Sequence, residues 1–256
     1  MHIGSNAFYR IFEESFATGE RSFDADYLLF ASRGAFVLEN KRRQWLLPPQ
    51  RAALIACGTS ISVSSKGPAT SSSILFRNDE LGLTEGELRV FVMSDLARLM
   101  VAQAMRWGGA TEPSNDQAHF FHALASVVAE LSLIQLNTWL PRPSSSGLAK
   151  AIAVGLADLG RNIGFGQLAQ SGAVSERTLA RLFRRELGMT WTEFRHRARM
   201  IKAMEALAQE SVTEAGFQVG FESTSAFIRA FKAFSGQTPN AFKRSVVNSP
   251  RHARSP

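Results

Sequence analysis

Short apolar runs dominate the first ninety residues of the chain, and each run ends at a glycine, a proline or a polar turn. The runs cover residues 27–30, 35–38, 44–47, 52–57, 61–63 and 73–76. Apolar or alternating segments of this length, repeated at roughly 8–12-residue spacing, are typical of an antiparallel barrel or sandwich. The pattern therefore predicts an N-terminal β domain.

Two helical patterns follow the strand region. Ser94 is placed to cap a helix over residues 95–107, with Asp95 in its first turn. A second helix is predicted over residues 117–139, where apolar residues from Phe120 to Ile134 recur at spacings of three and four. This stripe either packs onto the β domain or forms a helix–helix interface of a homodimer.

Composition limits the class of protein. The chain has 256 residues, and none of its apolar runs reaches the length of about 18 residues that spans a bilayer. A single cysteine, Cys57, excludes an internal disulfide framework and a multi-cysteine zinc site. Cys57 ends an apolar run, so it is either a small buried hydrophobe or a redox-sensing thiol. We expect a soluble, cytoplasmic protein without a membrane partner.

The net charge of +7 is distributed unevenly. Residues 1–142 hold 13 basic and 14 acidic side chains, whereas residues 143–256 hold 16 basic and 8 acidic ones. The division falls at the Pro/Ser-rich stretch 141–147, which has the composition of a linker. We expect domains at 1–142 and 148–245, joined by a linker at 143–147 and followed by a flexible tail at 246–256. A net charge of +8 on the second part favours an acidic partner such as nucleic acid.

The basic part contains an internal repeat with an offset of 48 residues. Seven identities recur within 24 residues, and they pair Gly172, Ser175, Arg181, Phe183, Gly188, Thr190 and Phe194 with Gly220, Ser223, Arg229, Phe231, Gly236, Thr238 and Phe242. Basic residues also recur in the pairs Arg184/Lys232 and Arg195/Lys243. Repetition of the same turn, cap and arginine in register argues against an ordinary solvated basic surface.

Each copy of the repeat predicts a helix-turn-helix. In the first copy, helices over 165–170 and 176–187 flank a turn at Ser171-Gly172. In the second copy, helices over 212–219 and 225–234 flank Gly220. A longer helix over 191–209 joins the copies. An exposed helix fits the major groove of double-stranded DNA, and arginine matches guanine with two hydrogen bonds, so the pattern predicts DNA binding.

Residues from about 147 to 244 resemble the DNA-binding domain of AraC-type bacterial transcriptional regulators (AraC/XylS). The second copy carries the family's pattern in the order Gly220-Phe221, Phe227-Ile228-Arg229-Ala230-Phe231-Lys232, Gly236-Gln237-Thr238-Pro239 and Phe242-Lys243. The first copy matches through Leu168-Ala169, Ser175, Leu179 to Arg184, and Gly188. The stretches Leu47 to Ala52 and Ala56 to Thr59 resemble the strand-turn signature of the cupin-like sensor domain found in such regulators. The fold class implied is α+β, with an antiparallel cupin-like β-barrel followed by an all-α double helix-turn-helix.

The resemblance implies that the second helix of each copy reads DNA. By position, the base-contacting residues are Arg177, Thr178, Ala180 and Arg181, then Thr224, Ser225, Ile228 and Arg229. Ala180 and Ile228 cannot form hydrogen bonds, so they either touch thymine methyl groups or act as spacers. Arg181 and Arg229 are the strongest candidates, and their alternative role is a salt bridge to Glu176, Glu186 or Glu222. The phosphate contacts are expected at Arg184, Arg185, Arg195, Lys232 and Lys243.

One residue departs from the family pattern. Regulators of this type usually have a bulky apolar residue followed by alanine in the first helix of the second copy, where this chain has Ala215-Gly216. A glycine inside a helix costs about 1 kcal/mol relative to alanine. The departure predicts a looser second copy that contributes less affinity for DNA.

A small-molecule effector is expected in the β domain, with Tyr27, Phe30, Phe36 and Trp45 as candidate lining residues. The histidines are His2, His119, His122, His196 and His252, and none lies in the strand region, so we expect no metal, no cofactor and no catalytic residue. His119 and His122 have a spacing that suits a shared metal, but no third ligand is identifiable. RNA polymerase and a second copy of the chain are expected partners. The alternatives are an enzyme acting in the barrel and a basic architectural protein that binds all DNA sequences alike.

Overall fold

The computed structural model describes residues 6–76, 81–107 and 114–247, with side chains up to residue 244. Within these residues, ten strands form two five-stranded sheets. Contacts divide the chain into two compact units. Of the described residues, the first contains those up to Asn40 together with Trp45–Asn137, and the second contains Lys41–Gln44 together with residues 138–247.

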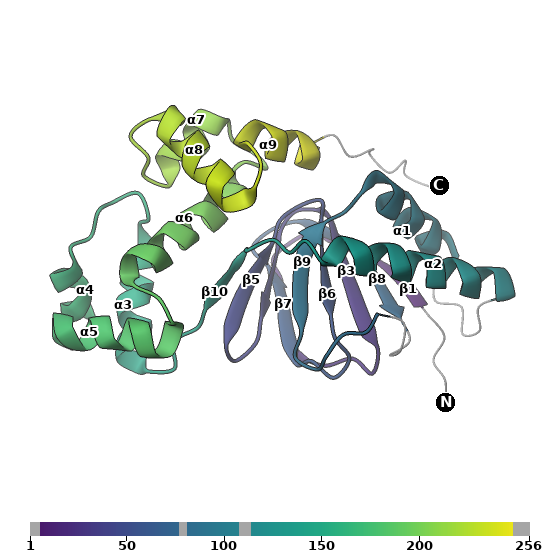
Figure 1. Ribbon diagram of the computed structural model, residues 1–256, viewed down its shortest axis with the longest axis horizontal. Helices are drawn as coiled ribbons and strands as arrows, with labels where there is room; N and C mark the ends of the chain where they lie inside the picture. The colour runs from purple at the N-terminus through teal and green to yellow at the C-terminus, as the bar shows by residue number, and fades with distance from the viewer. Residues whose placement is uncertain (1–5, 77–80, 108–113, 248–256) are drawn as a thin grey trace. The chain divides into compact units, whose positions relative to one another are not determined.

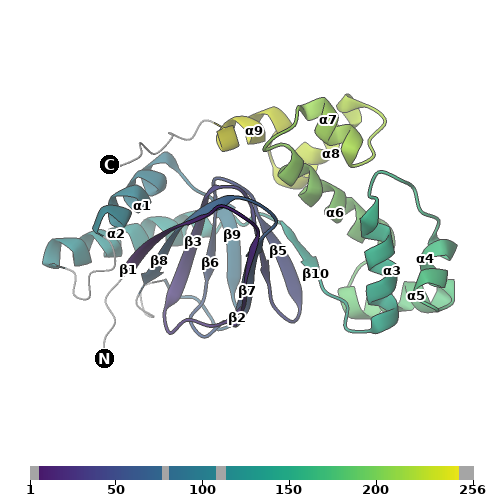
Figure 2. The same cartoon turned by 180° about the vertical axis from the view of Figure 1, so that it is seen from behind.

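The first sheet has the strand order β1-β8-β3-β6-β9, and its pairs are antiparallel. These strands are β1 (Asn6–Phe12), β8 (Ala69–Phe76), β3 (Asp26–Arg33), β6 (Arg51–Ile55) and β9 (Leu88–Val92). The second sheet has the order β10-β5-β4-β7-β2 (Figure 2). Its strands are β10 (Trp139–Pro141), β5 (Arg43–Leu47), β4 (Phe36–Glu39), β7 (Ile61–Ser65) and β2 (Phe16–Arg21). The antiparallel N-terminal β domain expected from the sequence is present.

Two helices cover the outer face of the first sheet (Figure 1). They are α1 (Asp95–Trp107) and α2 (Asn115–Ser132). The apolar stripe of α2 places Phe121, Leu124 and Val128 in the core shared with Leu28 and Phe30 of β3. Burying these side chains stabilises the first unit by about 1.5–3 kcal/mol for each large residue. Packing onto the β domain thus accounts for the stripe, although Leu133 and Ile134 beyond its end are exposed.

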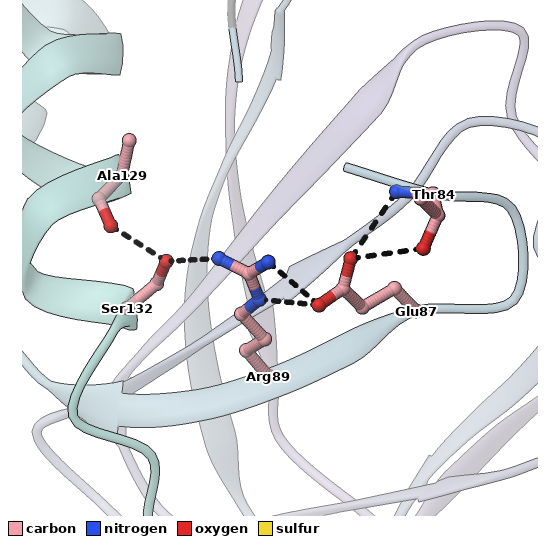
Figure 3. A network of polar contacts seen from close by, with 5 residues as sticks. All are labelled: Thr84, Glu87, Arg89, Ala129 and Ser132. Carbon is pink, nitrogen blue, oxygen red and sulfur yellow. Dashed lines mark hydrogen bonds and ion pairs between the residues drawn. The ribbon is translucent and has the colours of Figure 1, made fainter. Parts of the chain in front are cut away.

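The sequence pattern predicts a helix up to Trp139, whereas α2 ends at Ser132. A polar network fixes this end against β9 (Figure 3). The Ser132 hydroxyl donates to the Ala129 carbonyl at 2.8 Å and accepts from Arg89 Nη1 at 3.2 Å. Arg89 also donates to Glu87, whose other carboxylate oxygen accepts from the Thr84 backbone and hydroxyl groups. Burial raises the pKa of Glu87, but these hydrogen bonds outweigh burial and hold it below its usual value.

The second unit is helical between Ser146 and Val247. Its helices are α3 (Ser146–Ala157), α4 (Phe165–Ser171), α5 (Glu176–Leu182), α6 (Trp191–Ala206), α7 (Val212–Gln218), α8 (Thr224–Ser235) and α9 (Pro239–Val247). A π-helical turn, Phe183–Leu187, continues α5. The sequence predicts neither α3, which begins within the expected linker, nor the full extent of α9. The expected tail at 246–256 lies outside the described residues from 248 on.

Aromatic residues organise the core around α5. Phe183, Trp191 and Phe194 are buried together, with ring centroids 5.8–6.2 Å apart. Gly155 of α3 leaves space for this cluster, because a Cβ atom there would lie 2.3 Å from the Trp191 ring. A glycine in the middle of α3 is thus a packing requirement, and it outweighs the low helix propensity of glycine.

Candidate nucleic-acid interface and interior cavity

The two repeat copies build their second helices, α5 and α8, in the same way. Ser175 caps α5 by accepting a hydrogen bond from the Thr178 backbone at 3.2 Å, and Ser223 caps α8 by accepting from the Ala226 backbone at 3.3 Å. Each helix ends at a glycine in the left-handed region, with φ of 69° at Gly188 and 76° at Gly236. A side chain with a Cβ atom adopts that conformation at a cost, which explains the repeated glycine.

One face of each second helix is buried. Leu179, Leu182 and Phe183 pack in the core of the first copy, and Phe227 and Phe231 pack in the core of the second. The ring centroids of Phe227 and Phe231 lie 5.6 Å apart in an edge-to-face arrangement. Because α5 and α8 are anchored along their buried faces, the opposite faces are held in fixed orientations.

Most of the predicted contact residues lie on these opposite faces. Arg177, Ala180, Arg181, Arg184 and Arg185 are exposed on the first copy, and Ser225, Arg229 and Lys232 are exposed on the second. Thr178, Thr224 and Ile228 are half-buried. The Thr178 hydroxyl accepts from the Ser175 hydroxyl at 3.0 Å, so it is part of the cap as well.

The exposed arginines at the repeated position are not held by carboxylates. Among the described residues, neither Arg181 nor Arg229 forms a hydrogen bond or an ion pair through its side chain. Glu186 is engaged elsewhere, since its Oε2 accepts from the Ser144 and Ser145 backbone groups at 2.9 Å each. Arg185, unlike Arg181 and Arg229, forms an ion pair, since its Nη2 lies 3.2 Å from Glu186 Oε1.

The repeated pair Arg195/Lys243 is placed differently from the other predicted phosphate contacts. The Arg195 guanidinium donates to the Asn162 side chain at 3.0 Å and to the Leu159 and Arg161 carbonyls at 3.3 and 2.6 Å. Lys243 Nζ donates to the Glu210 carbonyl at 2.7 Å. Residues 162 and 210 are themselves equivalent in the repeat. Both cations therefore tie down the loop that precedes their helix-turn-helix, and the structure does not group them with the exposed cations of α5 and α8.

The departure at Ala215-Gly216 has a local cause. Gly216 is buried in α7, and a Cβ atom there would lie 3.0 Å from Cγ and Cδ1 of Phe227. Glycine lets α7 approach α8 closely. The interpretation of Gly216 as a source of looseness is therefore replaced by one in which it permits tight packing.

A cavity of about 200 Å³ lies between the two sheets of the first unit. Tyr27 and Phe36, two of the four residues proposed from sequence, line it. Phe30 does not, because alternation along β3 directs it with Leu28 into the core beneath α1 and α2. Trp45 is buried outside the lining. The full lining is Phe8, Arg10, Phe12, Phe16, Thr18, Arg21, Phe23, Tyr27, Leu29, Phe36, Ile61, Val63, Ser71, Ser73 and Leu75.

Arg10 and Arg21 are not among the candidates predicted from the sequence, and Glu186 is predicted only as a partner of Arg181 or Arg229. Arg10 and Arg21 belong to β1 and β2, which precede the first strand predicted from the apolar pattern. The enrichment of this segment in aromatic and β-branched residues (Phe8, Tyr9, Ile11 and Phe12) is a signal that favours β1. Nothing in the spacing of Glu186 marks its contact with Ser144 and Ser145.

The described residues around His119, His122 and Cys57 do not form a cluster of metal-ligating side chains. His119 and His122 are both exposed on α2, and within the described ranges no three metal-ligating side chains gather in one place. Cys57 is half-buried, and its backbone N–H donates to Asp26 Oδ1 at 2.8 Å. No helix among the described residues has the length and apolarity needed to cross a membrane.

Comparison with known proteins agrees with the repeat. A family model described as a helix-turn-helix domain matches residues 168–245. The HTH-type transcriptional regulator NimR of Escherichia coli is 26% identical over 235 residues, which cover 89% of this chain and 83% of NimR. The protein is a helix-turn-helix transcriptional regulator, and its DNA-binding part resembles that of AraC-type regulators. RipA of Corynebacterium diphtheriae, another HTH-type transcriptional regulator, is 38% identical over 77 residues, which cover 30% of this regulator and 23% of RipA.

Solved structures give weaker similarity to the regulator. ToxT of Vibrio cholerae, solved with a bound unsaturated fatty acid, is 13% identical with a TM-score of 0.40, and the match covers 97% of each chain. A transcriptional regulator with an AraC-type DNA-binding domain from Chromobacterium violaceum is 24% identical with a TM-score of 0.38. That match covers 40% of the regulator and 95% of the solved chain.

Proposed function

We propose that α5 and α8 read base edges of double-stranded DNA, and that a small molecule in the interior cavity controls this binding. The observation that carries the first half is the equivalence of Arg181 and Arg229. Both lie on identically capped helices, both are exposed, and neither is engaged by a described residue. A guanidinium in this state is available for the two acceptors on the major-groove edge of guanine.

The other exposed residues take roles set by their chemistry. Arg177, Thr178, Ser225 and Thr224 offer hydrogen-bond donors near the N-termini of the two helices, where side chains reach base edges. Ala180 and Ile228 offer only apolar contact, which suits a thymine methyl group. Arg184, Arg185 and Lys232 flank these faces and are assigned to phosphates, whereas Arg195 and Lys243 are assigned to the loops that they bind.

Selection of fragments of the source genome by the full chain, at a stated salt concentration, tests DNA reading. We expect a defined sequence motif to emerge. Substitution of Arg181 by alanine should weaken the selected site by about 1–3 kcal/mol and relax one base position. Arg33, exposed on β3, provides a matched arginine control whose loss should leave the motif intact. Equal affinity for every fragment would instead support an architectural DNA-binding protein.

The cavity supports the second half of the proposal. It lies in the unit that lacks the recognition helices, and it is lined by both apolar and polar side chains, as is usual for small-molecule sites. Binding there would shift the population of DNA-competent states through differential affinity.

A thermal-denaturation screen of small metabolites tests effector binding, because a ligand of the folded state raises the melting temperature. Val63 lines the cavity, whereas Val37, on the neighbouring strand β4, does not. A true effector should stabilise the parent protein and the Val37→Phe variant, but it should not stabilise the cavity-filled Val63→Phe variant. It should also change operator affinity. A hit that stabilises both phenylalanine variants equally would place the binding site elsewhere.

The remaining parts of the proposal concern cellular context. We place the regulator in the cytoplasm with its DNA, as a homodimer able to contact RNA polymerase, with residues 1–142 as the sensor part and 148–245 as the DNA-binding part. No catalytic step is assigned to either part. Sedimentation at the concentrations that saturate the operator tests the dimer, and a monomer under those conditions would contradict it.

A further inference from the structure

Polar groups in the cavity cluster on the inner face of the first sheet. Alternation along β1 directs Phe8, Arg10 and Phe12 inward, and the strand register pairs Arg10 with Ser71 and Phe8 with Ser73 on β8. The Tyr27 hydroxyl lies 2.8 Å from the Ser73 hydroxyl. One guanidinium and three hydroxyl groups are therefore held on neighbouring strands of one wall.

The charge of the lining is entirely positive. Arg10 and Arg21 are its ionisable cations, and no carboxylate belongs to the described residues that line the cavity. Arg21 Nε donates to the Thr18 carbonyl at 3.1 Å, and its Nη groups donate to no described residue. Arg10 also has no hydrogen bond to a described residue. Glu20, the neighbour of Arg21 on β2, is outside the lining, and its Oε1 accepts from the Ser60 hydroxyl at 2.7 Å. This lining is complementary to an anion.

Aromatic rings form much of the remaining wall. Phe12 and Phe16 stack with centroids 3.7 Å apart, and Phe36 meets both edge-on at 6.2 and 6.0 Å. Phe23 and Tyr27 lie 4.5 Å apart. Such rings favour offset or edge-to-face contact with another ring. A flat aromatic body therefore suits the apolar part of the cavity.

The volume limits the size of the occupant. An engineered apolar cavity of about 150 Å³ holds one benzene molecule, and the cavity here measures about 200 Å³. The difference leaves space for one small substituent on a single ring. A long alkyl chain would extend out of this volume, past the exposed side chains of Arg10 and Arg21.

We propose that the cavity binds a small aromatic carboxylate consisting of one ring and one carboxyl group. This inference rests on the proposed function, because it names the chemical class of the effector. Arg10 and Arg21 bind the carboxylate through charge-assisted hydrogen bonds, with Ser71, Ser73 and Tyr27 as further donors, and the ring lies among the phenylalanines. Burial raises the pKa of Tyr27, so its hydroxyl keeps the proton that it donates at neutral pH.

Calorimetric titration of the full chain with benzoate, benzamide and dodecanoate tests the class of ligand. Benzamide matches benzoate in shape without its charge, and dodecanoate keeps the carboxylate but replaces the ring with a long chain. We expect benzoate to bind at least tenfold more tightly than either. Arg10→Ala should remove the preference for benzoate over benzamide while leaving benzamide binding unchanged, and Arg33→Ala should have no effect on any titration.

The outcomes separate this inference from the proposed function. If benzamide binds as tightly as benzoate, or dodecanoate binds better, the proposed class is wrong while control by a cavity ligand stands. If none of the three probes binds, the class is also wrong, and the metabolite screen with Val63→Phe then decides the proposed function independently. Should Arg10→Ala unfold the chain, Arg10→Lys keeps the charge and is expected to weaken benzoate binding without abolishing it.

Discussion

The contact between Gly216 and Phe227 shows how a single residue acts through its neighbour rather than through its own propensity. Phe227 is fully buried, and its ring centroid lies 5.5 Å from that of Phe221 and 5.6 Å from that of Phe231. A buried ring with two aromatic neighbours has little freedom to move away from an added methyl group. Helix propensity favours alanine at position 216, whereas packing against Phe227 favours glycine.

We expect Gly216→Ala to lower the free energy of unfolding by about 1 kcal/mol. Overpacking a core costs about 1–3 kcal/mol, and the better helix propensity of alanine returns about 1 kcal/mol of that cost. Urea denaturation of the full chain measures the change. Phe217→Ala, at an exposed position of the same helix, is the control and should stay within about 0.5 kcal/mol of the parent. A more stable Gly216→Ala variant would show that propensity dominates.

At the scale of residues, the repeat predicts which positions recur but not what each recurring side chain contacts. Arg181/Arg229 and Arg195/Lys243 are equally regular in the sequence. Arg181 and Arg229 are exposed, whereas Arg195 and Lys243 are hydrogen-bonded to loops. Residues 162 and 210 come close to Arg195 and Lys243 only in the folded chain. Long-range proximity of this kind leaves no periodic signal in the sequence.

At the scale of elements, the second helices of the two repeat copies, α5 and α8, differ at their C-terminal ends. The π-helical turn after α5 carries Glu186, whose side chain is 6% exposed and accepts from the backbone N–H groups that precede α3. In α8 the equivalent position is Phe234, which meets His196 edge-on with ring centroids 6.4 Å apart. Among the residues that the structure describes, α5 is the one of these two helices that a carboxylate ties to Ser144 and Ser145, just before α3.

Glu186→Ala should destabilise the DNA-binding unit by about 2 kcal/mol, because two hydrogen bonds to a charged group are lost. Burial alone raises the pKa of Glu186, but the Ser145 and Ser144 groups outweigh it and hold the pKa at about 2, below the ordinary 4.5. Since the folded-state pKa is depressed, this stabilisation is complete above the ordinary pKa and is lost as the pH falls from 4.5 towards 2.

Chemical denaturation at pH 7 and pH 3 measures this effect. The difference between Glu186→Ala and the parent should be smaller at pH 3. Glu186→Gln, which keeps an acceptor but has no titratable group, should lie between them at pH 7. Glu222, an exposed carboxylate in the same unit, supplies the control Glu222→Ala. An equal loss of stability at both pH values would mean that the charge of Glu186 contributes nothing.

Several element boundaries could be predicted, and the failures have physical causes. Ser94 caps the helix expected after it, since its hydroxyl accepts from the Ala97 backbone at 3.1 Å. The strands β1 and β2 were not predicted, because most of their residues are exposed and their sequences mix charged with apolar side chains. The predicted extension of α2 to Trp139 failed because side-chain contacts to β9 end the helix earlier than its apolar periodicity indicates.

At the scale of the whole molecule, the charge division seen in the sequence places the basic excess in the chain that forms the second unit. Phosphate contacts make DNA affinity depend on salt, with a slope of log affinity against log salt of about −0.9 for each neutralised phosphate. The exposed cations and the loop-bound cations of this unit should therefore behave differently when each is removed.

Arg184→Ala should reduce the steepness of the salt dependence by about 1 and weaken all DNA sequences alike, because an exposed phosphate contact is lost. Arg195→Ala should leave that slope unchanged and should lower the melting temperature instead, since three hydrogen bonds to the loop at 159–162 are lost. Fluorescence anisotropy at several salt concentrations, combined with thermal melts, measures both quantities. A change of slope in Arg195→Ala would return Arg195 to the phosphate contacts.

Fold class and DNA-binding function were predictable at this scale because the repeat is local and its signature residues lie within about 100 positions. The lining of the interior cavity was only half predictable. Tyr27 and Phe36 lie on strands with clear apolar runs. Arg10 and Arg21 lie on β1 and β2, which pair with strands that are distant in the sequence.

The pairing of those early strands also bears on how the chain folds. Asn6 on β1 pairs with Leu75, and Phe16 on β2 pairs with Ser65, so the first two strands of the chain gain partners only after long loops close. The helices from α3 onward pack mainly on neighbours that are close in sequence, such as α4 on α3 and α8 on α7. Because non-local pairing slows folding, the N-terminal unit should recover its structure later than the C-terminal unit after denaturant is diluted. A refolding chain would then pass through a period in which its C-terminal unit can bind DNA although the cavity of its N-terminal unit has not yet formed.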